Sequence, residues 1–224
     1  MIIVVSVGGS VLARTLDAEK FRGYASALKE IAKNNTLFVV TGGGKAARDY
    51  IGVARELGAD EATCDLIGIE LTRLNARLLI AALGDAAYCE PPLDYKEAKR
   101  ASLSIRIIVM GGVAPGQTTD AVSAVLAEYI GADLLINATS IDGVYTSDPK
   151  KNRDAKKLDK LTPKQLIEII LKTEMVAGAN APVDLLAAKV IERSNIKTIV
   201  LSGENPRNIL DAVNGRYTGT VIEK

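Results

Sequence analysis

Short apolar runs rich in β-branched residues alternate along the chain with longer segments in which apolar residues recur at helical spacing. The short runs predict strands at residues 2–7, 36–41, 105–110, 133–138, 196–201 and 220–222. The longer segments predict helices at residues 17–34, 45–57, 65–83, 119–130, 163–172, 183–193 and 206–213. Because strands separated by such helices are joined by crossovers, the pattern predicts an α/β fold whose mostly parallel sheet is covered on both faces.

One polar stretch interrupts this pattern. Residues 148–160 carry five lysines and one arginine. We expect a solvated loop there, and recognition of phosphate by its basic side chains is the alternative.

The composition is typical of a globular protein. A length of 224 residues suits one large α/β domain or two small lobes, and 48% apolar residues can fill a core. The 28 basic and 27 acidic residues nearly balance, so we expect no binding to nucleic acid or to a membrane surface. No apolar run reaches the roughly 18–20 residues of a membrane span, and no basic leader precedes Ile2. We expect a soluble, cytoplasmic protein.

The chain contains no histidine and only two cysteines, Cys64 and Cys89, which lack the spacing of metal ligands. Both cysteines are expected to be small packed residues rather than redox centres. The absence of histidine excludes Ser–His and Cys–His nucleophilic catalysis and the usual zinc sites. Any chemistry must therefore depend on carboxylates, lysines, arginines, hydroxyls and backbone amides.

Glycine-rich turns follow three of the predicted strands. They occupy residues 8–10, residues 42–45 and residues 111–120, and predicted helices begin directly after the second and third turns. Glycine lets the backbone approach an anion closely, and a helix N-terminus adds free N–H groups and the positive end of the dipole. Because parallel strands end at one edge of the sheet, three such turns together predict a phosphate site there.

The two commonest phosphate-binding motifs are absent. Val39 and Val40 precede the triple glycine and Ala46 follows Lys45, so the pattern is not a Walker A loop. No G-x-G-x-x-G follows a predicted strand, so the dinucleotide fingerprint is missing as well.

Polar side chains near these turns suit a phosphorylated ligand. Lys45 and Arg48 fall in the first turn of a predicted helix, where a cation is unfavourable unless an anion lies against the helix end. Arg48 is therefore either a bidentate phosphate clamp or an exposed surface cation. Thr118 and Thr119 are expected to cap the next helix, which is compatible with phosphate binding. Asp65 is either a helix cap or an acceptor for ribose hydroxyls.

The segment after the fourth predicted strand, residues 137–149, is different and suits a nucleoside. The ring of Tyr145 would lie beside a base, and Asp148 would accept a hydrogen bond from a ribose hydroxyl. Asp142 and Gly143 could equally form a plain turn. Further along the chain, Asp184 begins a predicted helix and could be only its N-cap.

Taken together, these motifs resemble the amino-acid kinase family, and within it the archaeal UMP kinases. The resemblance covers essentially the whole chain, in order and at fitting intervals. The motifs that carry it are Gly8-Gly9-Ser10, Gly42-Gly43-Gly44-Lys45, Asp65-Leu66-Ile67-Gly68, Pro115-Gly116-Gln117-Thr118-Thr119-Asp120-Ala121, Ile141-Asp142-Gly143-Val144-Tyr145, Asp148-Pro149 and Val183-Asp184-Leu185-Leu186-Ala187-Ala188-Lys189.

The resemblance implies one three-layer αβα sandwich over residues 1–224 and transfer of the γ-phosphoryl group of ATP to UMP in pyrimidine biosynthesis. It implies that UMP lies against Gly43, Asp65, Val113, Ala114, Pro115, Gly116, Gln117, Thr118 and Thr119. It implies that ATP lies against Gly9, Ser10, Gly44, Arg48, Thr139, Tyr145 and Asp148. The catalytic set that it implies is Asp184, which would organise the transfer site, with Arg48, Lys45 and Asp120. No protein metal site is implied, since Mg²⁺ would arrive on the phosphates of ATP, and the assembly would be a homohexamer built as a trimer of dimers.

One residue departs from the family pattern. Many relatives carry a lysine two residues before the first glycine turn, and here that position is Ser6. Either Lys45, Arg48 or another lysine supplies the charge, or magnesium and backbone amides suffice. Two other functions stay open: a related kinase with another acceptor, such as carbamate, acetylglutamate, aspartate or an isoprenoid phosphate, and a non-enzymatic nucleotide- or oxyanion-binding protein.

Overall fold

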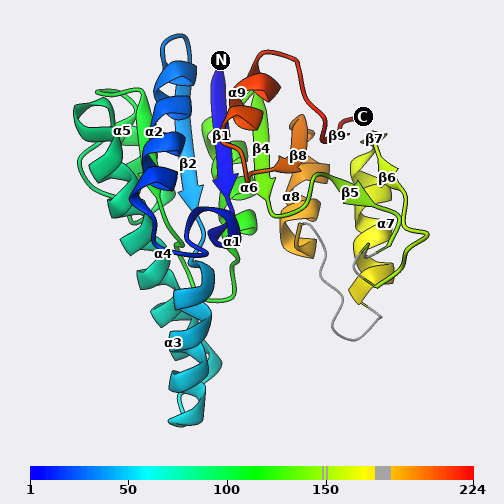
Figure 1. The fold of residues 1–224 in the computed structure, drawn as a ribbon, viewed down its shortest axis with the longest axis horizontal. Coiled ribbons are helices and arrows are strands. Elements are labelled where there is room, and N and C mark those ends of the chain that lie inside the picture. The colour runs from blue at the N-terminus through cyan, green and yellow to red at the C-terminus, as the bar shows by residue number, and fades with distance from the viewer. Residues whose placement is uncertain (148, 150, 175–182) are drawn as a thin grey trace.

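The computed structural model describes residues 1–147, 149, 151–174 and 183–224. Its centre is a seven-stranded sheet in the order β3-β2-β1-β4-β8-β9-β7 (Figure 1). In chain order these strands are β1 (Ile2–Val7), β2 (Thr36–Thr41), β3 (Ile107–Met110), β4 (Leu134–Thr139), β7 (Lys160–Leu161), β8 (Thr198–Ser202) and β9 (Thr220–Ile222). Strands β5 (Val144–Tyr145) and β6 (Lys157–Leu158) form a separate antiparallel pair.

The prediction of a mostly parallel sheet is confirmed. Strand β1 pairs in parallel with both β2 and β4, and the parallel register continues to β3 on one side and to β8 on the other. Strand β9 pairs antiparallel with β8 and parallel with β7. The carboxyl ends of β1, β2, β3 and β4 therefore lie along one edge.

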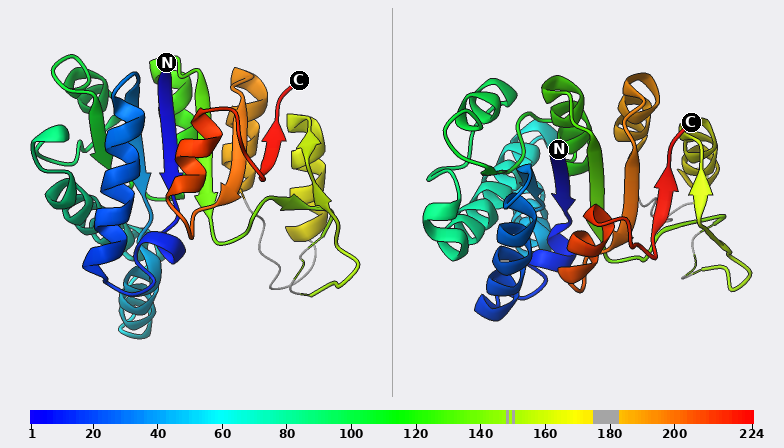
Figure 2. Two further views of the ribbon diagram at one scale, coloured as in Figure 1. Left: turned by 45° about the horizontal axis from the view of Figure 1, so that its top comes forward. Right: turned by 90° about the horizontal axis from the view of Figure 1, so that it is seen from above.

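Helices cover both faces of the sheet, so the described structure is a three-layer αβα sandwich. The view from above in Figure 2 shows the sheet between two rows of helices. The helices are α1 (Gly9–Leu12), α2 (Ala18–Ala32), α3 (Gly44–Glu56), α4 (Glu61–Leu83), α5 (Tyr95–Ala101), α6 (Thr119–Ile130), α7 (Pro163–Glu174), α8 (Leu185–Ser194) and α9 (Arg207–Val213), with a 3-10 turn at Gly84–Ala86.

Side chains that alternate along each strand fill two separate cores. On β1, Ile3, Val5 and Val7 pack with α2, α4 and α9, whereas Val4 packs in the second core with α5, α6, α7 and α8. The alternation is the physical origin of the two cores, because neighbouring strand residues point to opposite faces. Ser6 points to the same side as Val4, toward α6, and is almost fully buried.

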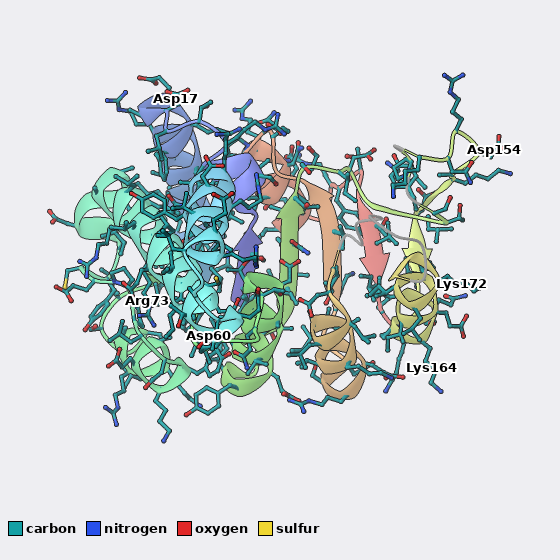
Figure 3. All side chains as sticks on the ribbon, turned by 90° about the horizontal axis from the view of Figure 1, so that it is seen from below. Asp17, Asp60, Arg73, Asp154, Lys164 and Lys172 are labelled. Atoms are coloured by element: carbon teal, nitrogen blue, oxygen red, sulfur yellow. The ribbon has the colours of Figure 1, made fainter. Side chains whose placement is uncertain are left out.

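The prediction from the sequence missed the short elements and placed the start of one helix wrongly. Helix α4 begins at Glu61 rather than at Asp65, because the side chain of Asp60, which is labelled in Figure 3, caps it and accepts the N–H of Thr63 at 2.7 Å. Helices α1 and α5 were also missed. The expected solvated loop at residues 148–160 is wrong in part, since β6 and the start of β7 fall inside it.

No described helix combines the length and the hydropathy that a membrane span requires. Helix α3 projects beyond the carboxyl edge of the sheet (Figure 1). This helix and α4 pack side by side, and both display large apolar side chains to solvent, among them Tyr50, Val53, Leu66, Leu74 and Leu78.

Candidate active site

The first two glycine turns touch each other through their backbones at the carboxyl edge. A Cβ built on Gly9 would lie 2.0 Å from the nitrogen of Gly44, and one built on Gly42 would lie 2.3 Å from the nitrogen of Gly9. Gly44 also adopts a φ of 71°, in the left-handed region that favours glycine. These positions therefore exclude any side chain, and they bring the backbone of the first turn against the start of α3.

Buried polar side chains of α4 hold the glycine turns from behind. The amide of Asn75 donates to the carbonyl oxygens of Gly42 at 2.8 Å and Gly43 at 3.2 Å. The hydroxyl of Thr72 accepts the N–H of Gly112 at 2.7 Å. The sequence analysis missed both residues, although two buried polar side chains in an apolar helix are a usable signal.

Of the two predicted cations, Lys45 lies in the first turn of α3, whereas Arg48 lies just beyond it because the helix begins one residue earlier than predicted, at Gly44; both are exposed. Lys45 forms an ion pair with Asp49 at 2.8 Å on the same helix. Arg48 makes no hydrogen bond or ion pair with any other residue that the structure describes, so its guanidinium group is available to a ligand.

Asp65 is held against the third glycine turn. It lies inside α4, so the expectation that it could be a helix cap is wrong. Its Oδ2 accepts the N–H of Gly116 at 2.7 Å, which joins α4 to the loop at residues 113–119. The same loop is held by α5, where the hydroxyl of Tyr95 donates to Gln117 at 3.1 Å, a contact that the sequence analysis did not predict.

Thr118 and Asp184 are helix caps that are bonded to each other. The hydroxyl oxygen of Thr118 accepts the N–H of Ala121 at 3.1 Å at the start of α6. Asp184 accepts the N–H of Ala187 at 2.9 Å at the start of α8. The Thr118 hydroxyl also donates to the other carboxylate oxygen of Asp184. The capping expected for both residues is present, and the bond between them brings two helix N-termini together.

Asp120 lies in the first turn of α6, above the centre of the sheet. Its Oδ1 accepts the hydroxyl of Ser6 at 2.9 Å, and the side chain of Asn137 on β4 is a second hydrogen-bond partner. Desolvation by the surrounding protein, assisted by the negative charge of Asp184, raises the pKa of Asp120 to about 6, against the lowering effect of its two hydrogen bonds. Asp120 is therefore a carboxyl group that changes charge close to neutral pH.

The end of β4 and the β5–β6 pair form the remaining part of the site. Thr139 accepts the N–H of Gly203 through its carbonyl at 2.8 Å, which joins β4 to the turn after β8. The hydroxyl of Tyr145 donates to Asp142 at 2.7 Å. The predicted ribose ligand Asp148 lies outside the described residues.

The structure thus brings the predicted residues to one edge of the sheet. Gly9, Ser10, Gly43 and Gly44 follow β1 and β2, the loop at residues 113–119 follows β3, and Thr139 ends β4. Among the predicted catalytic residues, Lys45 forms its ion pair with Asp49 on the same helix and is not joined to another element by it. The roles assigned to these residues remain predictions.

A sequence model of the amino acid kinase family matches residues 1–202. The chain belongs to this family. Its relatives include a uridylate kinase of Methanococcoides burtonii, 59% identical over 213 residues, which covers 95% of this chain and 91% of the relative. A uridylate kinase of Archaeoglobus fulgidus is 54% identical over 222 residues, with 99% of this chain and all of the relative covered.

Solved structures of family members agree with the fold. The crystal structure of uridylate kinase from Archaeoglobus fulgidus superposes with a TM-score of 0.92 at 53% identity and covers 99% of this chain and 100% of its own. The structure of UMP kinase from Ureaplasma parvum, at 23% identity and a TM-score of 0.84, shows that the fold persists when most of the sequence has changed.

Proposed function

We propose that this protein is a nucleoside monophosphate kinase that transfers the γ-phosphoryl group of ATP to UMP, giving ADP and UDP for pyrimidine biosynthesis. The observation that carries the proposal is its end-to-end similarity to uridylate kinases, at 54% identity over the whole of the Archaeoglobus fulgidus relative. The geometry of the carboxyl edge supports it, because that edge offers amide groups, hydroxyls and the guanidinium group of Arg48, which has no partner among the described residues, to phosphates.

UMP is assigned to the β2–β3 side of the edge. Asp65 would accept hydrogen bonds from the ribose hydroxyls through the carboxylate oxygen that Gly116 leaves free. Thr119 and the N-terminus of α6 would receive the phosphate, with the positive end of the helix dipole directed at it. The remaining contacts would come from Gly43 and from the loop at residues 113–118.

ATP is assigned to the other side of the edge. Its phosphates would lie against Gly9, Ser10 and Gly44, where the closely packed turns present backbone N–H groups. Thr139, Tyr145 and Asp148 would contact the nucleoside. Arg48 would lie between the two nucleotides, where it can hold oxygens of both phosphate groups.

The chemistry of transfer needs positioning and charge stabilisation more than a covalent intermediate. Amides fixed by the glycine turns and the cations Arg48 and Lys45 would stabilise the charge that spreads over the transferring group. Asp184 would organise the site, since it joins α8 to the acceptor loop through Thr118. Asp120 would act beside it as a carboxyl group whose charge is set by burial.

Magnesium is expected to enter with ATP. Among the described residues no group of three or more Asp, Glu, Cys or His side chains could enclose a metal ion. Mg²⁺ usually takes its ligands from substrate phosphates and water. The ion would neutralise charge on the phosphates of ATP.

We further propose that residues 1–224 act as one domain and that the protein is a cytoplasmic homohexamer. Apolar side chains exposed on α3 and α4 support association, because exposed Leu66 and Leu74 lie on the same helix and Tyr50 and Val53 lie on its neighbour. Light scattering during size-exclusion chromatography would measure the mass, and a monomer at micromolar concentration would contradict the hexamer.

The decisive experiment measures ADP release from Mg-ATP with UMP, CMP, carbamate, acetylglutamate and isopentenyl phosphate offered separately. We expect turnover with UMP. Turnover with another acceptor but not with UMP would assign the protein to a related kinase. Tight ATP binding without turnover of any acceptor would instead favour a storage or sensor function.

A further inference from the structure

Lys157, in the basic stretch after β5, points into the protein rather than into solvent. Its ammonium group donates to the carbonyl oxygen of Thr218 at 2.8 Å and to Oδ2 of Asp142 at 3.1 Å. The side chain is 27% exposed, whereas the side chain of its neighbour Lys156 makes no hydrogen bond or ion pair with another described residue. Lys157 therefore differs from a solvated surface lysine.

The carboxylate that Lys157 contacts also holds Tyr145. Oδ1 of Asp142 accepts the hydroxyl of Tyr145 at 2.7 Å while Oδ2 accepts Lys157. Tyr145 and Lys157 are directly opposite in the antiparallel β5–β6 pair, so their side chains share one face. Burial works to raise the pKa of Asp142, but the hydrogen bonds from Tyr145 and Lys157 outweigh it and lower that pKa. The bridging carboxylate thus stays ionised at neutral pH.

The backbone around this bridge is fixed by the last strand of the sheet. The hydroxyl of Thr220, on β9, accepts the N–H of Val144 at 2.7 Å and donates to the carbonyl of Leu158 at 2.6 Å. A Cβ on Gly143 would lie 2.6 Å from that hydroxyl and 3.1 Å from the side chain of Lys157. Gly143 is therefore required for close packing and is more than a turn residue.

The Tyr145–Asp142–Lys157 contacts, called the bridge here, lie at the base of the loop between β5 and β6. Asp154 in this loop lies at the margin of the molecule (Figure 3). Tyr145, by contrast, is half-buried and donates to Asp142, which is joined through Lys157 to Thr218 in the segment that leads into β9. The contacts fix the direction of its ring on the side of the site assigned to ATP.

We propose that Lys157 is a positioning residue for the nucleoside of the phosphoryl donor, acting through Asp142 on the ring of Tyr145. The inference rests on the proposed function in taking the donor to be a nucleoside triphosphate and in taking Tyr145 to contact its base. Lys157 itself would touch no substrate. Its ion pair holds the Asp142 carboxylate, the carboxylate holds the Tyr145 hydroxyl, and the tyrosine ring is then ordered for contact with the base before ATP binds.

The test compares Lys157→Met, which keeps the aliphatic stem, with Lys156→Met, an exposed lysine one residue away. We expect Lys157→Met to raise the KM for ATP roughly tenfold and to leave the KM for UMP unchanged. Lys157→Arg should restore most of the affinity, and Lys156→Met should behave as the parent protein. Equal increases in both KM values would show general damage and would overturn the inference.

Two further measurements separate a role through Tyr145 from a general loss of structure. Calorimetric binding of inorganic tripolyphosphate, which has no base, should be the same for Lys157→Met and the parent protein. Tyr145→Phe, which keeps the ring and loses the bond to Asp142, should weaken ATP about as much as Lys157→Met, and the double variant should be no worse. Additive losses, or weaker tripolyphosphate binding, would contradict the proposal.

The direct binding experiments also separate this inference from the proposed kinase activity. If the parent protein binds ATP but does not phosphorylate UMP, the function falls while the role of Lys157 is still decided by ATP affinity. If it turns over UMP and Lys157→Met binds ATP normally, the function stands and the inference falls. Absence of ATP binding by the parent protein would overturn both.

Discussion

The hydroxyl of Ser6 donates a hydrogen bond of 2.9 Å to the carboxylate of Asp120, from the centre of the sheet to the first turn of α6. Ser6 occupies the position at which the family resemblance leads us to expect a lysine. The structure gives this serine a definite partner in the candidate site, because burial and the charge of Asp184 raise the pKa of Asp120 while the bond from Ser6 lowers it. Removing the hydroxyl should therefore favour protonated Asp120.

We predict that Ser6→Ala moves the acid limb of the kcat profile to higher pH by about one unit, if ionised Asp120 is the working form. Profiles from pH 5 to pH 9 would measure the shift. Ser123→Ala is the matched control, because Ser123 is an equally buried serine on α6 whose hydroxyl donates to the carbonyl of Thr119 instead. An unshifted limb in Ser6→Ala, or an equal shift in the control, would refute the prediction.

Asp120→Asn should stabilise the protein at alkaline pH while it impairs activity. The pKa of Asp120 rises from an ordinary 3.8 to about 6 on folding, so ionisation above pH 6 costs stability and the cost disappears as the pH falls through this window. We expect a gain on the order of 1–3 kcal/mol in the free energy of unfolding at pH 8, shrinking by about half at pH 5. Chemical denaturation at the two pH values would measure it, and an advantage independent of pH would contradict the assignment.

Asp65→Asn should weaken the binding of UMP far more than that of ATP. Asparagine keeps an oxygen that can accept the N–H of Gly116, but it loses the ionised oxygen available to the ribose. Calorimetric titration with each nucleotide would measure the two affinities separately. An equal loss for both would remove the ribose role from Asp65.

Arg48→Ala should reduce kcat/KM, with a loss of about 2–4 kcal/mol in transition-state stabilisation. The thermal stability should not change. The reason is that Arg48 is exposed and forms no ion pair with another residue in the described part of the chain. Arg55→Ala, at the opposite end of α3 and paired with Glu61 at 2.7 Å, is the control for loss of a helix cation. An unchanged kcat/KM in Arg48→Ala would show that Arg48 is an exposed surface cation with no role in the reaction.

Asn75→Ala should weaken the binding of ATP and of UMP together. The amide of Asn75 donates to the carbonyl oxygens of Gly42 and Gly43. Because Asn75 is buried, its removal leaves both carbonyl oxygens without this donor. We expect a loss of about 1–3 kcal/mol in the free energy of unfolding. Denaturation curves and binding of ATP and UMP would be measured on the same sample, and a loss confined to one nucleotide would contradict this role.

The parts of the fold that depend on local pattern could be predicted from the sequence. The ends of β1, β2 and β9 agree with the predicted boundaries because each is a compact β-branched run. The start of α4 could not be found in the same way, since its first turn is polar and its cap, Asp60, precedes the apolar repeat. Strands β5, β6 and β7 have two residues each, too short for any periodicity to appear.

The candidate site was predictable where its residues follow strands. The glycine turns and Asp65 are visible in the sequence because strand ends and glycine runs are local signals. The partner of Ser6 is not, since it lies 114 positions away and depends on how α6 packs on the sheet. The inward direction of Lys157 was hidden as well, because a lysine in a basic stretch has the same local signal whether it faces solvent or a carboxylate.

The contact between the glycine turns restricts how this site can change over evolutionary time. Gly9, Gly42 and Gly44 are so close that no side chain can be added to one without displacing the others, whereas Pro115 and Gly116 of the neighbouring loop are exposed. The turns form a part that must be inherited unchanged, whereas the loop at residues 113–117 can accept other side chains at exposed Pro115, although the φ of 77° at Gly116 still favours glycine there. A descendant of this protein with a different phosphoryl acceptor would therefore be expected to carry its substitutions in that loop and on the neighbouring face of α4.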